Sequence, residues 1–146
     1  MPTFLIRSSE PGTNSAAAIK YAAEKGFLSC VAIGCLGGRL DHTFSSICLL
    51  KYAYDLGIEL VLEDENTRVY LSGKYKKVYK EDYKYVSVFP FGNEAKGVSL
   101  SGFKYPLSDA FLNIKFPLGV SNVIVSDYGE IRVNEGMLIV MEVREC

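Results

Sequence analysis

The residue types best suited to chemistry lie between positions 37 and 43, in the order Gly-Gly-Arg-Leu-Asp-His-Thr. They follow a short apolar run, Cys30–Gly34, and precede a segment with helical spacing, so they predict a strand-to-helix turn. Two glycines let the backbone approach a ligand closely, Arg39 can bind phosphate, and Asp41 places a carboxylate at the start of the helix. This combination suits a phosphorylated ligand with its metal ion. The alternative is that Asp41 simply caps the helix.

Length and composition indicate a globular protein of one domain, or of two very small ones. The chain has 146 residues, 49% of them hydrophobic, which is enough for a sizeable core. The net charge of −1 gives no indication of a nucleic-acid surface. The one basic cluster, Lys74–Lys77, is soon offset by Glu81 and Asp82 and is interpreted as a solvated hairpin.

The cysteines and the N-terminus bear on the cellular compartment. The four cysteines show no metal-ligand spacing and no CxxC pair, and Cys30, Cys35 and Cys48 lie in apolar surroundings where a free thiol behaves as a small hydrophobe. A reducing compartment fits this usage best. Neither a secretory signal nor a membrane-spanning run is recognisable, so the expected protein is soluble and cytoplasmic and binds no membrane.

The elements that must position the glycine turn alternate between strand and helix. Strands are expected at 3–6, 30–34 and 58–62. A first helix begins near Thr13–Ser15 and stops at Gly26, with Ala16, Ile19 and Ala23 on one face. A second helix follows the glycine turn and stops at Gly57, with Leu49, Ala53 and Leu56 on one face. This order predicts a parallel sheet over residues 1–66.

The second part of the chain, residues 67–146, contains no convincing helix. Short strands separated by glycine or polar turns are expected at 67–71, 85–89, 97–101, 122–126, 130–134 and 137–143. Regular short strands of this kind predict a β-sandwich. The fold class is therefore α/β plus all-β, with a partial parallel sheet followed by a sandwich. So small a parallel sheet suggests either a partner that completes it or part of a longer architecture.

Four segments in order resemble motifs of the thiamine pyrophosphokinase family. Residues 34–43 resemble its GxxGGRxDHT motif, and residues 87–92 its SxFPxG strand. Residues 97–107 resemble its GvxLxGlkYPL segment, and residues 119–122 its GVSN motif. The resemblance runs from about Thr13 to the C-terminus, and the first part of the family's N-terminal domain has no counterpart in this sequence.

The resemblance implies a fold, a reaction and a set of site residues. It implies an α/β nucleotide-binding domain (1–66), a thiamine-binding β-sandwich (67–146) and a homodimer with shared sites. The implied reaction transfers a pyrophosphoryl group from ATP to thiamine with Mg²⁺, giving thiamine diphosphate and AMP. Positioning and charge neutralisation dominate such a transfer, so Asp41 and Arg39 are the catalytic candidates. The nucleotide-binding candidates are Gly37, Gly38, Arg39, Thr43 and Thr13, and the thiamine-binding candidates are Ser121 and Asn122.

Each of these residues can instead have a purely structural role. Ser121 and Asn122 can be plain turn residues, and Tyr105 with Pro106 is interpreted as a bend that packs against the sandwich. His42 is interpreted as a packed or capping residue rather than a base.

One departure from the family pattern favours a second hypothesis. The family's acidic KDxTDxE motif corresponds to residues 10–16, where Thr13 is kept but Asn14 and Ala16 stand in place of acids. Asp41 and Asn14 remain as magnesium ligands, and the amide of Asn14 brings no charge. The alternative is therefore a thiamine-binding or dimerisation module without catalysis.

Overall fold

The computed structural model describes residues 2–7, 15–116 and 118–144. The chain divides into two compact units, Met1–Tyr70 and Leu71–Cys146. Among the described residues, no helix is long and apolar enough to cross a membrane.

The first unit is a small α/β sheet. Its elements are β1 (Thr3–Arg7), α1 (Ser15–Glu24), β2 (Ser29–Ile33), α2 (Leu40–Asp55), β3 (Glu59–Glu63) and β4 (Thr67–Ser72), the last of which crosses the unit boundary. β1, β2 and β3 run parallel, with Phe4 opposite Cys30 and Cys30 opposite Leu60, and β4 is antiparallel to β3. The expected parallel sheet is confirmed.

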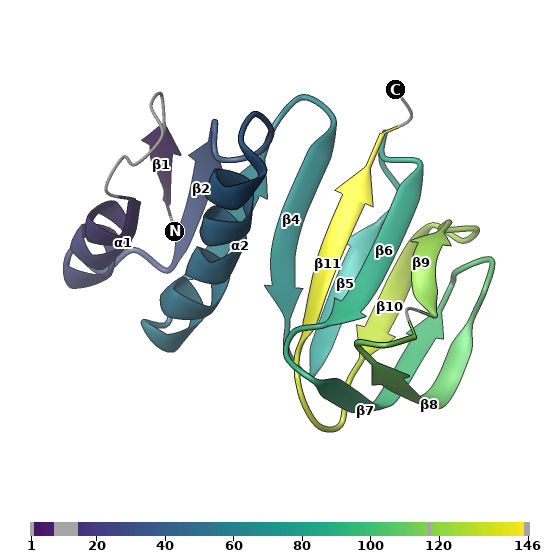
Figure 1. Cartoon of the computed structure of the whole chain (residues 1–146). Coiled ribbons are helices and arrows are strands. Elements are labelled where there is room, and N and C mark those ends of the chain that lie inside the picture. Colours follow the sequence, from purple (N-terminus) through teal and green to yellow (C-terminus); the bar gives the residue numbers. More distant parts are fainter. Residues whose placement is uncertain (1, 8–14, 117, 145–146) are drawn as a thin grey trace. The chain divides into compact units, whose positions relative to one another are not determined.

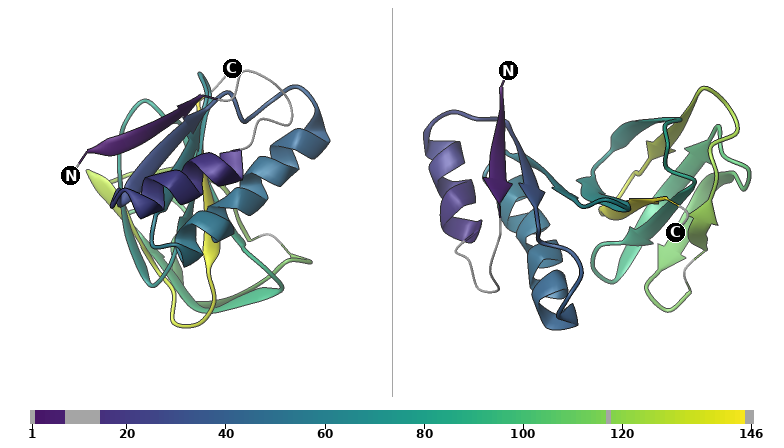
Figure 2. Two further views of the ribbon diagram at one scale, coloured as in Figure 1. Left: turned by 90° about the vertical axis from the view of Figure 1, so that its left-hand side faces the viewer. Right: turned by 90° about the horizontal axis from the view of Figure 1, so that it is seen from above.

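Both helices cover one face of this sheet (Figures 1 and 2). Ile6, Cys30, Ala32, Leu60 and Leu62 alternate along the strands and are buried. The helices end one or two residues before Gly26 and Gly57, as the sequence predicts.

The predicted helix faces are partly wrong. α1 buries Ile19 together with Ala22, and α2 buries Leu50 together with Ala53. Leu56 lies past the last turn of α2 and is 40% exposed. Helical spacing located the buried face of each helix only to within one residue. Adjacent apolar residues, such as Ala22 and Ala23 or Leu49 and Leu50, fit the helical spacing equally well.

The second unit is a β-sandwich. Its strands are β5 (Tyr75–Tyr79), β6 (Tyr85–Pro90), β7 (Glu94–Ser101), β8 (Leu107–Asn113), β9 (Gly119–Asn122), β10 (Tyr128–Arg132) and β11 (Leu138–Val143). One sheet has the order β11-β6-β9, the other β5-β10-β7-β8, and every pairing within them is antiparallel. The core is mostly aliphatic and includes Val88, Val98, Leu100, Ile131 and Val140. The predicted fold class, α/β plus a sandwich, is confirmed.

Three expectations for this unit are wrong. Residues 122–126 do not form a strand, because β9 ends at Asn122. The basic cluster is no solvated hairpin: β5 pairs with β10, and Lys77 Nζ lies 4.0 Å from the ring centroid of Tyr128. Strand β8 was not predicted, since only Leu112 in it is buried.

The three described cysteines are free thiols but differ in burial. Cys30 and Cys35 are buried as expected, and desolvation raises the pKa of the Cys30 thiol. Cys48 is exposed, which corrects the expectation that it packs as a small hydrophobe.

Candidate functional site

The glycine turn connects β2 to α2, where the sequence places it. Gly37 and Gly38 adopt φ angles of +82° and +67°, in the left-handed region that side-chain-bearing residues rarely enter. A Cβ added at either position would meet nothing within 4 Å. The two glycines are therefore required by backbone conformation, and the space beside them is open to a ligand.

Asp41 does not occupy the N-cap position, so that alternative is wrong. The N-cap of α2 is Arg39, whose side chain makes no capping hydrogen bond. Asp41 lies within the first turn, and its Oδ1 accepts the backbone N–H of His42 at 2.9 Å. A carboxylate there is favoured by the partial positive charge of the helix N-terminus.

Arg39 and Asp41 form a two-pronged ion pair. Arg39 Nε donates to Asp41 Oδ1 at 3.2 Å, and Nη2 donates to Oδ2 at 2.7 Å. The Arg39 guanidinium, with a smaller contribution from the His42 N–H, holds the pKa of the Asp41 carboxyl below its usual range. Both side chains are about two-thirds exposed, at 66% and 65%. The carboxylate is thus ionised at neutral pH, and the guanidinium remains accessible to phosphate.

Thr43 holds the turn closed. Its Oγ1 is placed to donate to the carbonyl oxygen of Gly37 at 3.1 Å or to that of Arg39 at 3.3 Å. A hydroxyl with one hydrogen shares it between these acceptors, so its interaction with a nucleotide would use its lone pairs. Thr13 and Asn14, the other nucleotide and metal candidates, lie outside the described residues.

Asp41 supplies one carboxylate to a possible magnesium site. Among residues 2–7, 15–116 and 118–144, no three His, Cys, Asp or Glu side chains are grouped to hold a metal. Mg²⁺ keeps several waters and is often held by one or two carboxylates together with substrate phosphates. Asp41 fits Mg²⁺ in that manner, as a partner to nucleotide phosphates.

The GVSN motif forms β9, and the side chain of its asparagine is hydrogen-bonded to backbone groups of the fold. Asn122 is 3% exposed. Its Oδ1 accepts the backbone N–H groups of Tyr105 and Val123, both at 3.0 Å, and its Nδ2 donates to the Tyr105 carbonyl at 2.8 Å. One Nδ2 hydrogen remains for any further partner.

Ser121 has the more unusual backbone. It is exposed and adopts φ +57°, one of two non-glycine residues with positive φ in the described part of the chain. Its backbone N–H donates to Oγ of Ser87, a buried residue, at 2.9 Å. A side chain in this region costs about 1–2 kcal/mol, and such outliers concentrate at functional sites.

The expected packing of Tyr105 against the sandwich is wrong. This residue was interpreted as a packed bend residue, yet its side chain is 59% exposed while its backbone is held by Asn122. The sequence did offer an indication of this exposure. The two segments that resemble family motifs, 97–107 and 119–122, both contain polar or aromatic residues that are not required for a hydrophobic core.

Comparisons with known proteins agree with one another. Residues 76–138 match the family model described as thiamin pyrophosphokinase, vitamin B1 binding domain. The thiamine pyrophosphokinase of Bacillus subtilis (strain 168) is 29% identical over 126 residues, which cover 85% of this chain and 59% of that protein. Thiamine pyrophosphokinase 2 of Oryza sativa subsp. japonica is 25% identical over 83% of this chain and 46% of its own length. The chain thus spans roughly half the length of these curated relatives.

Solved structures extend the likeness to three dimensions. The crystal structure of thiamine pyrophosphokinase from Bacillus subtilis superposes with a TM-score of 0.85 at 26% identity, covering 89% of this chain and 62% of that one. The thiamin pyrophosphokinase from Geobacillus thermodenitrificans gives 0.84 at 26% identity, covering 94% and 64%. The family model, the curated relatives and the solved structures all point to the thiamine pyrophosphokinase family.

Proposed function

We propose that this chain binds thiamine and transfers a pyrophosphoryl group to it from ATP, giving thiamine diphosphate and AMP. The observation that carries the proposal is the match of residues 76–138 to a vitamin B1 binding domain. The glycine turn supports the proposed ATP binding. Its two glycines have positive φ angles and open space beside them, and they are followed by an accessible arginine and an ionised carboxylate.

The proposed roles divide between the two parts of the chain. Residues 1–66 serve as the nucleotide-binding part, in which Arg39 binds phosphate and Asp41 holds magnesium or the thiamine hydroxyl. Magnesium, when bound, would neutralise phosphate charge. Residues 67–146 bind thiamine, with Ser121 presenting its hydroxyl and Asn122 its remaining N–H. We further propose a homodimer, and a cytoplasmic location that the free thiols of Cys30, Cys35 and Cys48 support.

A second candidate function is thiamine binding without catalysis. The ion pair between Arg39 and Asp41 favours it, because the arginine already neutralises the one carboxylate of the turn. An enzyme must separate this pair when phosphate and magnesium arrive, whereas a binding module leaves it intact.

Release of AMP from ATP separates the two candidates. We expect AMP only when thiamine and magnesium are both present, and we expect Asp41→Asn to lower turnover at least about tenfold while thiamine affinity stays unchanged. Asp55→Asn is the matched control, because Asp55 is also an exposed, ion-paired aspartate of α2. Thiamine binding without AMP would establish the second candidate. Equal turnover of the Asp41 and Asp55 variants would remove Asp41 from the mechanism.

A further inference from the structure

One face of the small α/β sheet is left uncovered by the helices of its own unit. Both helices cover the opposite face, so the residues of β1, β2 and β3 that alternate with the buried set point away from them (Figure 2). Two large apolar side chains on the uncovered face are exposed, Leu5 at 49% and Ile33 at 40%. Parallel sheets normally have both faces covered. The uncovered face is therefore a candidate interaction surface.

The strand register arranges the side chains of this face in three rows. Residues paired in register on neighbouring strands point to the same side of the sheet. The middle row is aliphatic and consists of Leu5, Val31 and Val61. The first row is polar and consists of Thr3, Ser29 and Glu59. The third row has a cation at one end and an acid at the other, in the order Arg7, Ile33 and Glu63.

A two-fold axis can bring two copies of this face together in two ways. Sheets that pack face to face keep their strand directions nearly aligned. When the axis runs along the strands, β1 of one copy lies over β3 of the other, and each row meets the same row of the second copy. When the axis runs across the strands, each strand lies over its own counterpart, and the first row meets the third.

The charges of the face favour the first arrangement. It places Arg7 over Glu63 of the second copy, and the contact occurs twice because a two-fold interface repeats every contact. Glu63 also lies beside Arg68 of β4 in its own sheet, so it meets cations from both chains. The second arrangement instead places Glu59 over Glu63 of the second copy, and like charges that face each other oppose association.

We propose that the three rows of this face join two copies of the chain, with β1 of each copy over β3 of the other. The aliphatic rows then pack on each other, with Val31 facing Val31 at the axis and Leu5 facing Val61 of the second copy. This inference rests on the homodimer of the proposed function and adds its surface and its orientation.

The size of the face indicates how tight such a dimer is. The three strands have five residues each. A strand spacing of ~4.8 Å and a rise of ~3.3 Å per residue give them a planar area of about 240 Å². Standard interfaces bury about 800 Å² per partner. We therefore expect a weak dimer whose population depends on concentration.

Sedimentation velocity over a range of concentrations tests the surface. We expect the unmodified chain to shift from monomer to dimer as its concentration rises. Arg7→Glu and Glu63→Arg should each weaken dimerisation at least about tenfold, because each variant brings like charges together at both contacts. An equal mixture of the two variants should dimerise again, since both contacts of the mixed dimer then pair opposite charges. Thermal unfolding of each variant shows whether it is folded.

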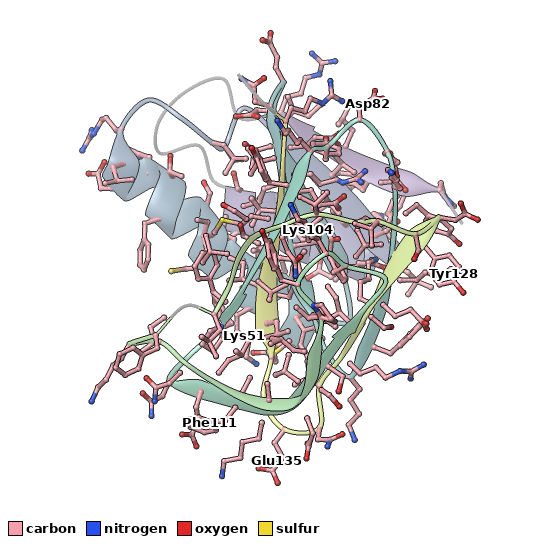
Figure 3. All side chains as sticks on the ribbon, turned by 90° about the vertical axis from the view of Figure 1, so that its right-hand side faces the viewer. Lys51, Asp82, Lys104, Phe111, Tyr128 and Glu135 are labelled. Carbon is pink, nitrogen blue, oxygen red and sulfur yellow. The ribbon has the colours of Figure 1, made fainter. Side chains whose placement is uncertain are left out.

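Lys104→Glu is the matched control. Lys104 is an exposed cation of the second unit (Figure 3), and its replacement changes the net charge as Arg7→Glu does. It should dimerise like the unmodified chain. Dimerisation of Arg7→Glu equal to that of Lys104→Glu would overturn this inference alone, as would a mixture of the two charge variants that stays monomeric. An unmodified chain that is monomeric at every concentration would overturn the proposed homodimer, and this surface with it. Because neither thiamine nor ATP is present, none of these outcomes depends on the proposed reaction.

Discussion

Two neighbouring residues of β9, Ser121 and Asn122, differ in burial, and we propose that they contribute differently to thiamine binding. The amide of Asn122 is buried and bound to the backbone groups of Tyr105, so most of its hydrogen-bonding capacity is used within the fold. Ser121 is exposed and conformationally strained, so it is the one of the pair that meets solvent directly. The motif thus combines a buried residue that holds the fold with an exposed residue that is accessible to a ligand.

Replacing the strained serine separates stability from binding. We expect Ser121→Gly to leave the free energy of unfolding unchanged or to raise it by up to about 1 kcal/mol, because glycine adopts φ +57° without a Cβ penalty. The same variant should bind thiamine more weakly, since it lacks the hydroxyl. Urea unfolding and thiamine titration measure the two effects, and a loss of stability with unchanged affinity would mean that Ser121 is structural.

At the scale of elements, sequence reasoning succeeded where a strand buries several side chains. β6 and β11 each bury three consecutive residues, several of them valine, leucine or isoleucine, and both strands were predicted to within a residue. β5 and β8 were missed because each buries a single side chain, Val78 and Leu112, so neither shows alternation. Their pairing with β10 and β7 depends on partners far along the chain.

The boundaries of β9 needed information that the sequence pattern does not contain. Val123 and Val125 look like strand residues, but the chain leaves the sheet after Asn122, whose side chain binds the Tyr105 backbone. The glycine turn was located correctly because its two glycines determine the backbone conformation of the turn itself, without partners far along the chain. The ion pair within it was not foreseen, since it depends on the side-chain orientations of Arg39 and Asp41.

The glycine of β9 has a packing role that a substitution exposes. A Cβ at Gly119 would lie 2.4 Å from Val88 Cγ2 and 2.9 Å from the Val88 carbonyl oxygen. We therefore expect Gly119→Ala to lower the free energy of unfolding by about 1–3 kcal/mol, as overpacked cores do. Urea unfolding of this variant measures the cost. Stability equal to that of the unmodified chain would show that β6 and β9 can separate without loss.

At the scale of the whole molecule, the two compact units carry candidate residues of different character. The first unit presents the charged pair Arg39 and Asp41 at the glycine turn, and the second presents the uncharged candidates Ser121 and Asn122. The two ligands, ATP and thiamine, should therefore differ in their dependence on magnesium. Proteins usually bind Mg²⁺ through one or two carboxylates together with the phosphates of a substrate.

Chelation of magnesium should therefore affect the two ligands unequally. We expect EDTA to leave the dissociation constant of thiamine unchanged, since the proposed thiamine-binding residues Ser121 and Asn122 are uncharged. The same treatment should weaken ATP binding. Calorimetric titration of each ligand with and without EDTA measures both effects. Magnesium-dependent thiamine binding would show that a carboxylate takes part in holding the vitamin.

Because Cys48 is exposed, a fluorescent label attached to its thiol can report on changes at the glycine turn. Cys48 follows Asp41 by seven residues on α2, so the two side chains point to the same side of the helix about 10 Å apart. Cys30 and Cys35 are buried and should resist a maleimide dye that reaches Cys48 readily. With Cys146, which lies outside the described residues, changed to serine, a fluorophore on Cys48 would become an optical reporter of the arrival of phosphate at Arg39.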